Sequence, residues 1–258
     1  LLESVYVELK LRLYVKCATV VEPTYYKLYY RKPMPAWSYS SISLFEQCPK
    51  KYYHIRVAKD IKEPDSEQII YGKEVHLAAE EYIRDGKPIP EKFAYIKPML
   101  DKLNAIKGEK LCENKLAVKL TTDGRLVPCD FFDKDTYWRG IADLIILDRD
   151  NQEARVIDYK TGSSAKYADT KQLKLLAGAV FTHYPEIRVI KAGLLFVVSK
   201  DFIKEEYDCH FRLAYFEQFR PLVQQLEDCH NNGVWNPKRN FSCKAWCPVL
   251  SCAHNGKN

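Results

Sequence analysis

The sequence predicts an α/β protein whose central mixed sheet is flanked by helices, with a helical region before the sheet and a cysteine cluster after it. Three observations support this fold class. The middle of the chain holds short runs rich in β-branched and aliphatic residues, bounded by Asp, Asn and Gly, which is typical of strands. Segments with apolar residues at helical intervals lie before and after these runs. The 47% hydrophobic and 29% charged content is that of an ordinary globular protein.

Residues 1–36 form an extension that differs from the rest of the chain. Residues 4–16 alternate between apolar and polar side chains, a pattern typical of a strand. The prolines on either side of Met34 then end regular structure. Because the chain begins at Leu1, we consider Met34 a candidate natural start, which would make residues 1–33 a non-native addition.

Helices and strands follow in a defined order from residue 40. Ser40 is the expected N-cap of the first helix, because its hydroxyl can accept a bond from a backbone N–H of the first turn. Gly86 and Gly108 are expected to end the second and third helices, since glycine adopts the left-handed conformation without strain. The expected helices cover 40–56, 70–85, 91–107, 168–183 and 214–231, and the expected strands cover 115–120, 139–148, 153–160, 187–198 and 206–212.

Charge and cysteine content narrow the class of protein. An excess of 40 Lys and Arg over 34 Asp and Glu gives a net charge of +6, which suits a polyanionic partner without requiring one. No run approaches the ~18 apolar residues needed to cross a bilayer, and no signal segment opens the chain. Nine cysteines without a secretory signal argue for reduced thiols, some of them ligands. We therefore expect an intracellular, cytoplasmic protein without a membrane partner, with a phage-encoded protein as one possibility within this class.

Two aspartates mark the most informative part of the chain. The expected strands 139–148 and 153–160 are joined by a turn-like Asp-Arg-Asp-Asn segment, which predicts a hairpin. If the turn is centred between the last two of these residues, Asp143 directly faces Asp158. Like charges at opposed positions repel, so a fold keeps such a pair when a cation or a shared proton relieves the repulsion. Strand alternation also places Lys160 on the face of Asp158.

An oxygen-lined site for Mg2+ or Mn2+ is the simplest relief for this repulsion. Two carboxylates and a lysine on one face supply the parts of metal-assisted phosphodiester hydrolysis. The metal polarises the phosphate and lowers the pKa of its bound water, while the lysine stabilises developing negative charge. The alternative is that Asp143, Asp158 and Lys160 are solvated surface residues. The pairing also depends on the register, because a slip of one residue would separate the aspartates.

A stripe on the expected helix 70–85 offers further groups. Gly72, His76 and Glu80 follow one another at intervals of four and therefore share one face. A neutral imidazole can join two carboxylates as a ligand of a divalent metal. Gly72 would let a backbone or a phosphate approach closely. The alternatives are a surface or core histidine and a glycine that begins the helix.

Taken together, four ordered motifs resemble those of the RecB-like branch of the PD-(D/E)XK nucleases. That branch includes the nuclease domains of bacterial recombination helicases, CRISPR-associated exonucleases and many phage exonucleases. The resemblance covers residues 37–258 and implies one nuclease domain with a restriction-endonuclease-like core. The motifs are residues 71–76 (YGKEVH), 140–143 (GIAD), 157–162 (IDYKTG) and Gln172.

The resemblance assigns roles to these positions. It implies that His76, Asp143 and Asp158 bind the divalent metal, Mg2+ or Mn2+, with the backbone carbonyl of Tyr159 as a further ligand. It also implies that Lys160 is the catalytic lysine and acts together with the two aspartates.

Two further positions extend the match. Gln172 matches a family glutamine near the scissile phosphate and would belong to the catalytic set. The tyrosine expected four residues later is Leu176 here, which puts that contact in doubt. Glu113 matches an acidic position that precedes the central strands of the family.

Cys243, Cys247 and Cys252 cluster near the C-terminus, and Cys48 lies far upstream. Four thiolates can hold a 4Fe-4S cluster or a structural zinc, and would clasp the two ends of the chain together. The arrangement resembles the iron-sulfur members of the RecB-like family, which place one cysteine before the nuclease core and three after it. The last three run C-x3-C-x4-C here against the usual C-x2-C-x5-C. We expect a 4Fe-4S cluster before zinc, with free buried cysteines as the remaining alternative.

The substrate follows mainly from the resemblance, which implies DNA rather than RNA and a free end rather than an internal site. Residues 50–56 interleave basic and aromatic side chains, and such a surface can bind a single strand; an amphipathic helix is the equal alternative. We therefore predict a metal-dependent deoxyribonuclease. It would be an exonuclease acting on single strands or duplex ends in recombination, repair or phage DNA metabolism, with a helicase or recombination partner or as a homo-oligomer.

Two other functions are alternatives to this prediction. The main one is a non-catalytic DNA-binding module of a larger nuclease or helicase complex, in which a partner cuts the DNA. Retention of Asp143, Asp158 and Lys160 together argues against it. The other is an enzyme that acts on small phosphorylated substrates, but no Gly-rich phosphate loop occurs among the 10 glycines.

Overall fold

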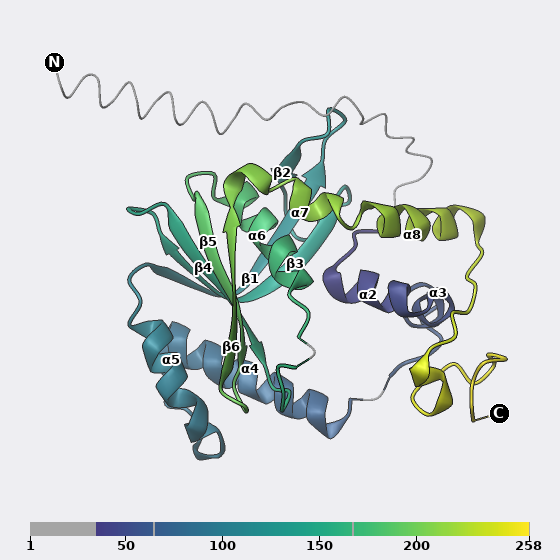
Figure 1. Cartoon of the computed structure of the whole chain (residues 1–258), viewed down its shortest axis with the longest axis horizontal. Coiled ribbons are helices and arrows are strands. Elements are labelled where there is room, and N and C mark those ends of the chain that lie inside the picture. Colours follow the sequence, from purple (N-terminus) through teal and green to yellow (C-terminus); the bar gives the residue numbers. More distant parts are fainter. Residues whose placement is uncertain (1–34, 64, 167, 258) are drawn as a thin grey trace.

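A mixed sheet forms the centre of the molecule (Figure 1). The structure, a computed structural model, describes residues 35–63, 65–166 and 168–257, and within them the chain forms a six-stranded sheet in the order β2-β1-β3-β4-β5-β6. β4 and β5 are parallel, and the other neighbouring strands are antiparallel. Helices flank this sheet, so the predicted fold class is confirmed. The strands are β1 (Glu109–Leu120), β2 (Leu126–Pro128), β3 (Trp138–Asp148), β4 (Glu153–Lys160), β5 (Val189–Phe196) and β6 (Asp201–Asp208).

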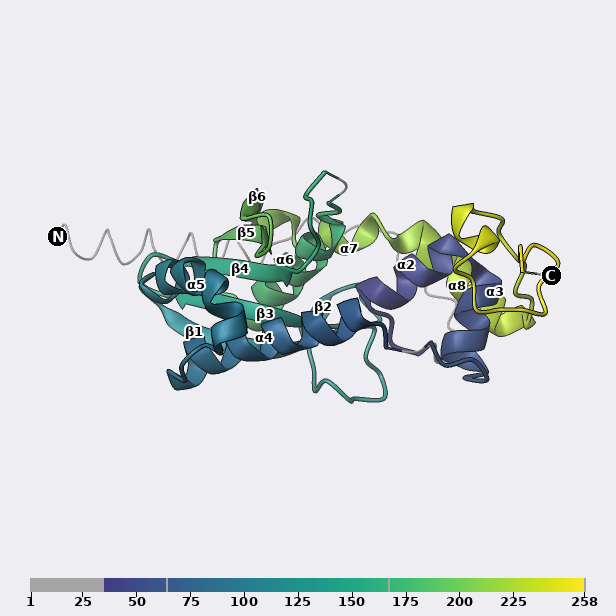
Figure 2. The same cartoon turned by 90° about the horizontal axis from the view of Figure 1, so that it is seen from below.

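Each face of the sheet packs against helices, because the central strands carry apolar side chains on both faces. One core lies between the sheet and α6 (Lys171–His183) and contains Ile145 of β3. The second core lies between the other face and helices α4 (Glu67–Asp85) and α5 (Lys97–Asn104), and contains Leu144. Figure 2 shows α4 and α6 on opposite sides of the sheet.

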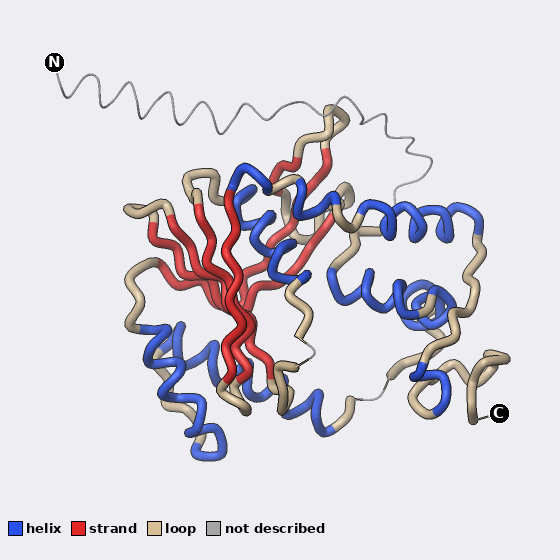
Figure 3. The backbone as a smooth tube through the Cα atoms, in the orientation of Figure 1, coloured by secondary structure: helices blue, strands red, loops and turns tan. Residues whose placement is uncertain are grey.

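Most of the remaining helices gather beside the C-terminal segment at one end of the sheet (Figures 1 and 3), whereas the short helix Ala214–Glu217 packs on α6. Tyr52 stacks on Trp235 with ring centroids 5.8 Å apart, and Phe45 meets both rings edge-on. This aromatic cluster joins the first helices to the last part of the chain. The helices are α2 (Tyr39–Gln47), α3 (Pro49–Tyr52), a π-helical turn (Tyr53–Val57), α7 (Ala214–Glu217) and α8 (Arg220–Asn232), with 3-10 turns at Glu91–Ile96, Cys209–Phe211 and Phe241–Lys244.

The first helix differs from the predicted one at both ends. Ser38, and not Ser40, is its N-cap: the Ser38 hydroxyl accepts from the Ser41 N–H at 3.2 Å, and the Ser41 hydroxyl accepts from the Ser38 N–H at 2.9 Å. This reciprocal capping box satisfies two donors that the helix itself leaves free. The last residue of the helix is Gln47, because Cys48 adopts an extended conformation. A new helix, α3, begins at Pro49.

Two other predicted helices are divided. The helix predicted over 91–107 is a 3-10 turn followed by α5, because Pro98 lacks an N–H donor and fits only in the first turn of a helix. The helix predicted over 214–231 is divided for the same reason into α7 and α8, with Pro221 in the first turn of α8. The strand predicted over 206–212 ends earlier, since β6 gives way to a 3-10 turn.

The sheet is also larger than periodicity predicts. β1 begins at Glu109 rather than at residue 115, and the short strand β2 has no sequence signal of its own. The strand predicted over 4–16 and the origin of residues 1–33 lie outside the described residues. No helix among the described residues is long and apolar enough to cross a membrane.

Candidate metal centre

Asp143 and Asp158 lie at the ends of the ladder between β3 and β4. This ladder has the predicted register, because Leu144 pairs with Ile157. The ladder stops there, one position before the two aspartates, so the predicted pairing of Asp143 directly with Asp158 is absent from it. The backbone N–H of Tyr159 instead donates to Asp143 Oδ2 at 2.6 Å. The two aspartates therefore lie at an opening in the sheet.

Glu113 lies opposite Asp143 on β1, at an interruption between two regular strand pairs. Glu113 has a φ of 47°, in the left-handed region that costs a non-glycine residue free energy and is found preferentially at functional sites. On β3 the alternation of faces also breaks, because Ala142 packs in the core of α6 and Leu144 in the core of α4. Glu113, Asp143 and His76 each offer a ligand atom, and these atoms lie within 4.8 Å of one another.

His76 contacts two groups of this site through its two ring nitrogens. Nδ1 lies 3.4 Å from Asp143 Oδ1, and Nε2 lies 3.0 Å from the backbone oxygen of Tyr159. Burial lowers the pKa of the imidazole, but the hydrogen bond and charge of Asp143, together with the charges of Asp158 and Glu113, raise this pKa above its ordinary value. The imidazole is thus surrounded by carboxylates.

The position of His76 follows from the packing of α4. Val75 and Ala79, which flank His76 on the helix, are buried against the sheet. Gly72 lies within α4 and does not begin it, since the helix starts at Glu67. A Cβ on Gly72 would lie 3.3 Å from Thr161 Oγ1, so the glycine allows α4 to approach the end of β4 closely. This approach brings His76 over the carboxylates.

Asp158 is buried, with 3% of its surface exposed, and pairs with Lys160. Lys160 Nζ lies 2.5 Å from Asp158 Oδ2, which agrees with their predicted common face, and donates to Gln172 Oε1 at 3.4 Å. Burial and then the charge of Asp143 raise the pKa of Asp158 to about 6, although Lys160 acts in the opposite direction. A cation beside these carboxylates would relieve the same repulsion.

The candidate metal centre, by which we mean His76, Glu113, Asp143 and Asp158, opens onto a groove of about 640 Å3 that Glu113 and Asp143 line together with residues of α4. Glu80 also lines the groove, as its place on the helix stripe predicts, but its carboxylate pairs with Arg84. Leu176, where the family pattern has tyrosine, is 1% exposed in the core of α6 and offers no polar group. The groove opens the carboxylates of Glu113 and Asp143 to solvent.

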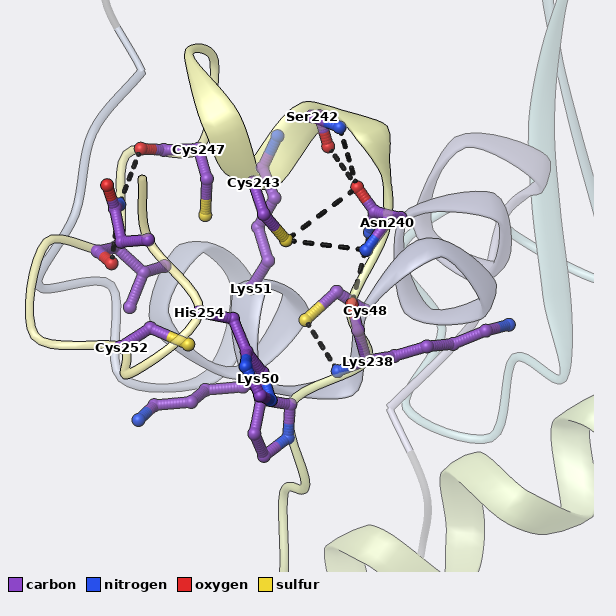
Figure 4. A pocket seen from close by; sticks show the side chains of 13 residues that line it. Cys48, Lys50, Lys51, Lys238, Asn240, Ser242, Cys243, Cys247, Cys252 and His254 are labelled. Carbon is purple, nitrogen blue, oxygen red and sulfur yellow. Dashed lines mark hydrogen bonds between the residues drawn. The ribbon is translucent and has the colours of Figure 1, made fainter. Parts of the chain in front are cut away.

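The four cysteines of the predicted cluster surround a common pocket, which we call the cysteine chamber (Figure 4). Cys48 comes from the junction of α2 and α3, and Cys243, Cys247 and Cys252 come from the C-terminal segment. Their exposed fractions lie between 6% and 9%, and Figure 4 shows their sulfur atoms turned toward one space. The donor set is therefore made of soft sulfur atoms, unlike that of the metal centre.

Two residues that sequence reasoning missed hold the chamber together. The backbone N–H groups of Lys238 and Asn240 donate to the sulfurs of Cys48 and Cys243, each at 3.4 Å. The Asn240 side chain also donates to the Gln47 carbonyl at 3.0 Å. Asn240 caps the turn Phe241–Lys244, and an Asn before a helical turn is the one sequence signal that marks it.

The basic and aromatic surface predicted over residues 50–56 is only partly exposed, because Tyr52 is buried and most of its neighbours are half-buried. Tyr52 is 6% exposed in the aromatic cluster with Trp235. Lys51 pairs with Glu63 at 2.8 Å. One face of this segment is therefore packed and the other is open to solvent, as expected for the amphipathic helix that was the alternative to a DNA-binding surface.

Comparison with known proteins identifies the family of the chain. The family model described as the PD-(D/E)XK nuclease superfamily matches residues 36–252, and the chain belongs to this superfamily. A solved structure described as "Crystal structure of SSO0001" is similar, with 15% sequence identity, a TM-score of 0.47, and coverage of 87% of this chain and 89% of that chain. No curated protein matches.

Proposed function

We propose that the chain is a metal-dependent DNA exonuclease of the RecB-like branch of the superfamily. The observation that carries this proposal is that His76, Glu113 and Asp143 lie together on one open groove. The ion pair between Asp158 and Lys160 lies at the neighbouring end of β4. A fold would not concentrate repelling carboxylates at a break in its sheet without a function that uses them.

The donor set fits a divalent cation. In the proposal, His76, Asp143, Asp158 and the carbonyl of Tyr159 hold Mg2+ or Mn2+, with Glu113 as a further carboxylate. Oxygen donors suit both ions, and an imidazole is a more common ligand of Mn2+ than of Mg2+. The bound cation would polarise the phosphodiester and lower the pKa of a water molecule.

Lys160 and Gln172 act on the phosphate in this proposal. The Lys160 ammonium is between the carboxylate of Asp158 and the amide of Gln172, so its position is fixed from both sides. A cation held in this way stabilises negative charge as it develops on the phosphate, without reorganisation during the reaction. The Gln172 amide orients the ammonium.

Digestion of end-labelled single-stranded and double-stranded DNA with Mg2+ or Mn2+ tests the proposal. We expect Asp158→Asn and Lys160→Gln to lose activity, and Asp150→Asn, which removes an exposed carboxylate in the β3–β4 turn, to retain it. Early release of labelled mononucleotides and resistance of circular strands would support an exonuclease. Equal activity in wild type and Asp158→Asn would refute the assignment to this site.

Absence of cleavage has a distinct meaning if the protein still binds DNA. Such a result would favour the non-catalytic DNA-binding module. Cleavage of circular strands would instead favour an endonuclease that uses the same residues.

We also propose that the cysteine chamber holds a 4Fe-4S cluster through Cys48, Cys243, Cys247 and Cys252. Tetrahedral zinc with Zn–S bonds of about 2.3 Å needs sulfurs about 3.8 Å apart. Among the described residues, the four sulfurs are not gathered as closely as a single tetrahedral ion would hold them, and our preference for the cluster rests on the resemblance to the iron-sulfur members of the family. The N–H donors to Cys48 and Cys243 suit cluster sulfurs, because hydrogen bonds to them tune the cluster.

Chemical analysis of protein purified without oxygen tests the cluster. We expect a brown protein with iron and inorganic sulfide in equal amounts, and a colourless Cys48→Ser variant. Stoichiometric zinc in a colourless wild type would refute the cluster.

We further infer that residues 37–258 form one nuclease domain, since the chamber joins its first helices to its C-terminal segment. The family resemblance supports an intracellular role in recombination, repair or phage DNA metabolism, with a helicase or recombination partner or a second copy of the chain.

A further inference from the structure

Two phenylalanines stand out on the loop 129–137 between β2 and β3. Phe132 is 74% exposed, and its ring meets that of Phe131 edge to face with centroids 5.2 Å apart. A lone exposed ring is common on protein surfaces. This pair differs because it lies on an ordered loop and beside two cations.

Hydrogen bonds fix the loop that carries both rings. Asp130 Oδ1 accepts from the Phe132 N–H at 2.9 Å, and the buried Thr136 hydroxyl donates to the Asp133 carbonyl at 2.7 Å. Asp133 also pairs with Lys119 at 2.5 Å. Two acidic side chains of the loop are therefore engaged in holding it, and an exposed aromatic surface is presented in one orientation.

Lys115 and Arg139 approach the rings from the sheet. Lys115 Nζ lies 5.8 Å from the centroid of each ring, and Arg139 Cζ lies 5.6 Å from that of Phe131. In the part of the chain that the structure describes, neither cation forms an ion pair with a carboxylate. Both charges are available to an anionic ligand.

The patch adjoins the groove of the candidate metal centre on the same two strands. Lys115 pairs with Ile141 across β1 and β3, and Ile141 lines the groove beside Asp143. Arg139 is four residues before Asp143 on the same strand, a distance of about 13 Å along it. A flexible polymer that reaches the carboxylates can therefore extend over the rings.

We propose that Phe131 and Phe132, with Lys115 and Arg139, form a docking site for single-stranded DNA whose end lies in the groove. This inference rests on the proposed function for the identity of the polymer. An unpaired base stacks on the exposed face of Phe132, while the two cations neutralise neighbouring phosphates. Paired bases cannot stack in this way, so the site selects a single strand over a duplex.

Fluorescence anisotropy with a labelled oligothymidine strand tests the stacking contact. EDTA in the buffer prevents cleavage, so binding is measured whether or not the protein is a nuclease. Phe132→Ala should weaken binding roughly tenfold. The control Phe211→Ala removes a 59% exposed ring that follows β6, at the opposite edge of the sheet, and should bind as wild type does.

A strand without bases separates stacking from charge. On an abasic strand of equal length, wild type and Phe132→Ala should bind alike, because the ring has lost its partner. For the cations, the double variant Lys115→Gln and Arg139→Gln should reduce the slope of log affinity against log salt by about 0.7 for each charge removed, whereas Lys204→Gln on β6 should not.

Two results would overturn the docking site. One is wild-type affinity of Phe132→Ala for oligothymidine, and the other is an equal loss of affinity on the base-containing and abasic strands. Circular dichroism of each variant verifies the fold. If the protein fails to cut DNA but Phe132→Ala loses binding, the docking site stands and the nuclease proposal alone fails.

Discussion

The metal centre and the cysteine chamber are both candidate metal sites, but they differ in how far the surrounding fold depends on a bound metal. The metal centre lies on strands and a helix that pack through apolar cores, and its carboxylates repel one another. The chamber lies in a segment with little regular structure, whose own small core is Cys247, Val249 and Cys252. The fold should exist without a metal at the first site, whereas the C-terminal segment needs its ligand.

The largest effect is expected from the chamber. Cys48→Ser should release the C-terminal segment, because binding free energy at a structural metal site is largely folding free energy, ~10 kcal/mol for zinc sites. Limited proteolysis with mass spectrometry should detect new cleavage after Gly233. Cys229→Ser, which changes a half-buried thiol outside the chamber, should remain resistant. Resistance of Cys48→Ser would mean that the segment folds without a cluster.

The metal centre should respond in the opposite way. Asp158→Asn should lower cleavage roughly a hundred- to a thousandfold. In metal-free protein it should raise the melting temperature, because a raised carboxyl pKa means that the ionised group destabilises the folded state at neutral pH. Calorimetry in EDTA measures this change, with Asp150→Asn as the exposed control. A lower melting temperature would show that Asp158 supports the fold.

Acidic pH should weaken the binding of a cation at the metal centre. The pKa of Asp158 is raised to about 6, so this group gains a proton as the pH falls through about 6, and the raised pKa of His76 means that the imidazole is protonated before that point. Protons then compete with the cation, and Mn2+ affinity should fall steeply below that pH, while metal-free protein loses no stability from these two groups. Titration calorimetry across this range measures the affinity. An affinity independent of pH would exclude both groups as ligands.

The smallest effect is expected at the contact between α4, which carries His76, and the end of β4, which carries Asp158. Gly72→Ala should lower cleavage a few-fold, because the added Cβ meets Thr161 Oγ1 and displaces α4 with His76. Stability should change by no more than about 1 kcal/mol, since alanine favours the helix. The double variant with Thr161→Ala should recover activity. If it does not, the space at Gly72 serves the substrate and not the packing.

Much of the metal centre could be predicted from the sequence because its parts are local. The register of β3 and β4 follows from a short turn, and the common face of Asp158 and Lys160 follows from strand alternation. Helix periodicity likewise gave the stripe that carries His76. These patterns act over a few residues, and the backbone enforces them wherever the strand or helix forms.

Only the tertiary structure decided which residues from distant segments contact these strands and this helix. It placed Glu113 in the left-handed region opposite Asp143, since that conformation depends on neighbouring strands and has no sequence signature. It buried Tyr52, whose surroundings had suggested a DNA surface, and exposed Phe132 instead. The local sequence around an aromatic residue does not show whether its ring is buried or exposed. Long-range packing decides this, because residues far apart in the sequence exclude water from one another.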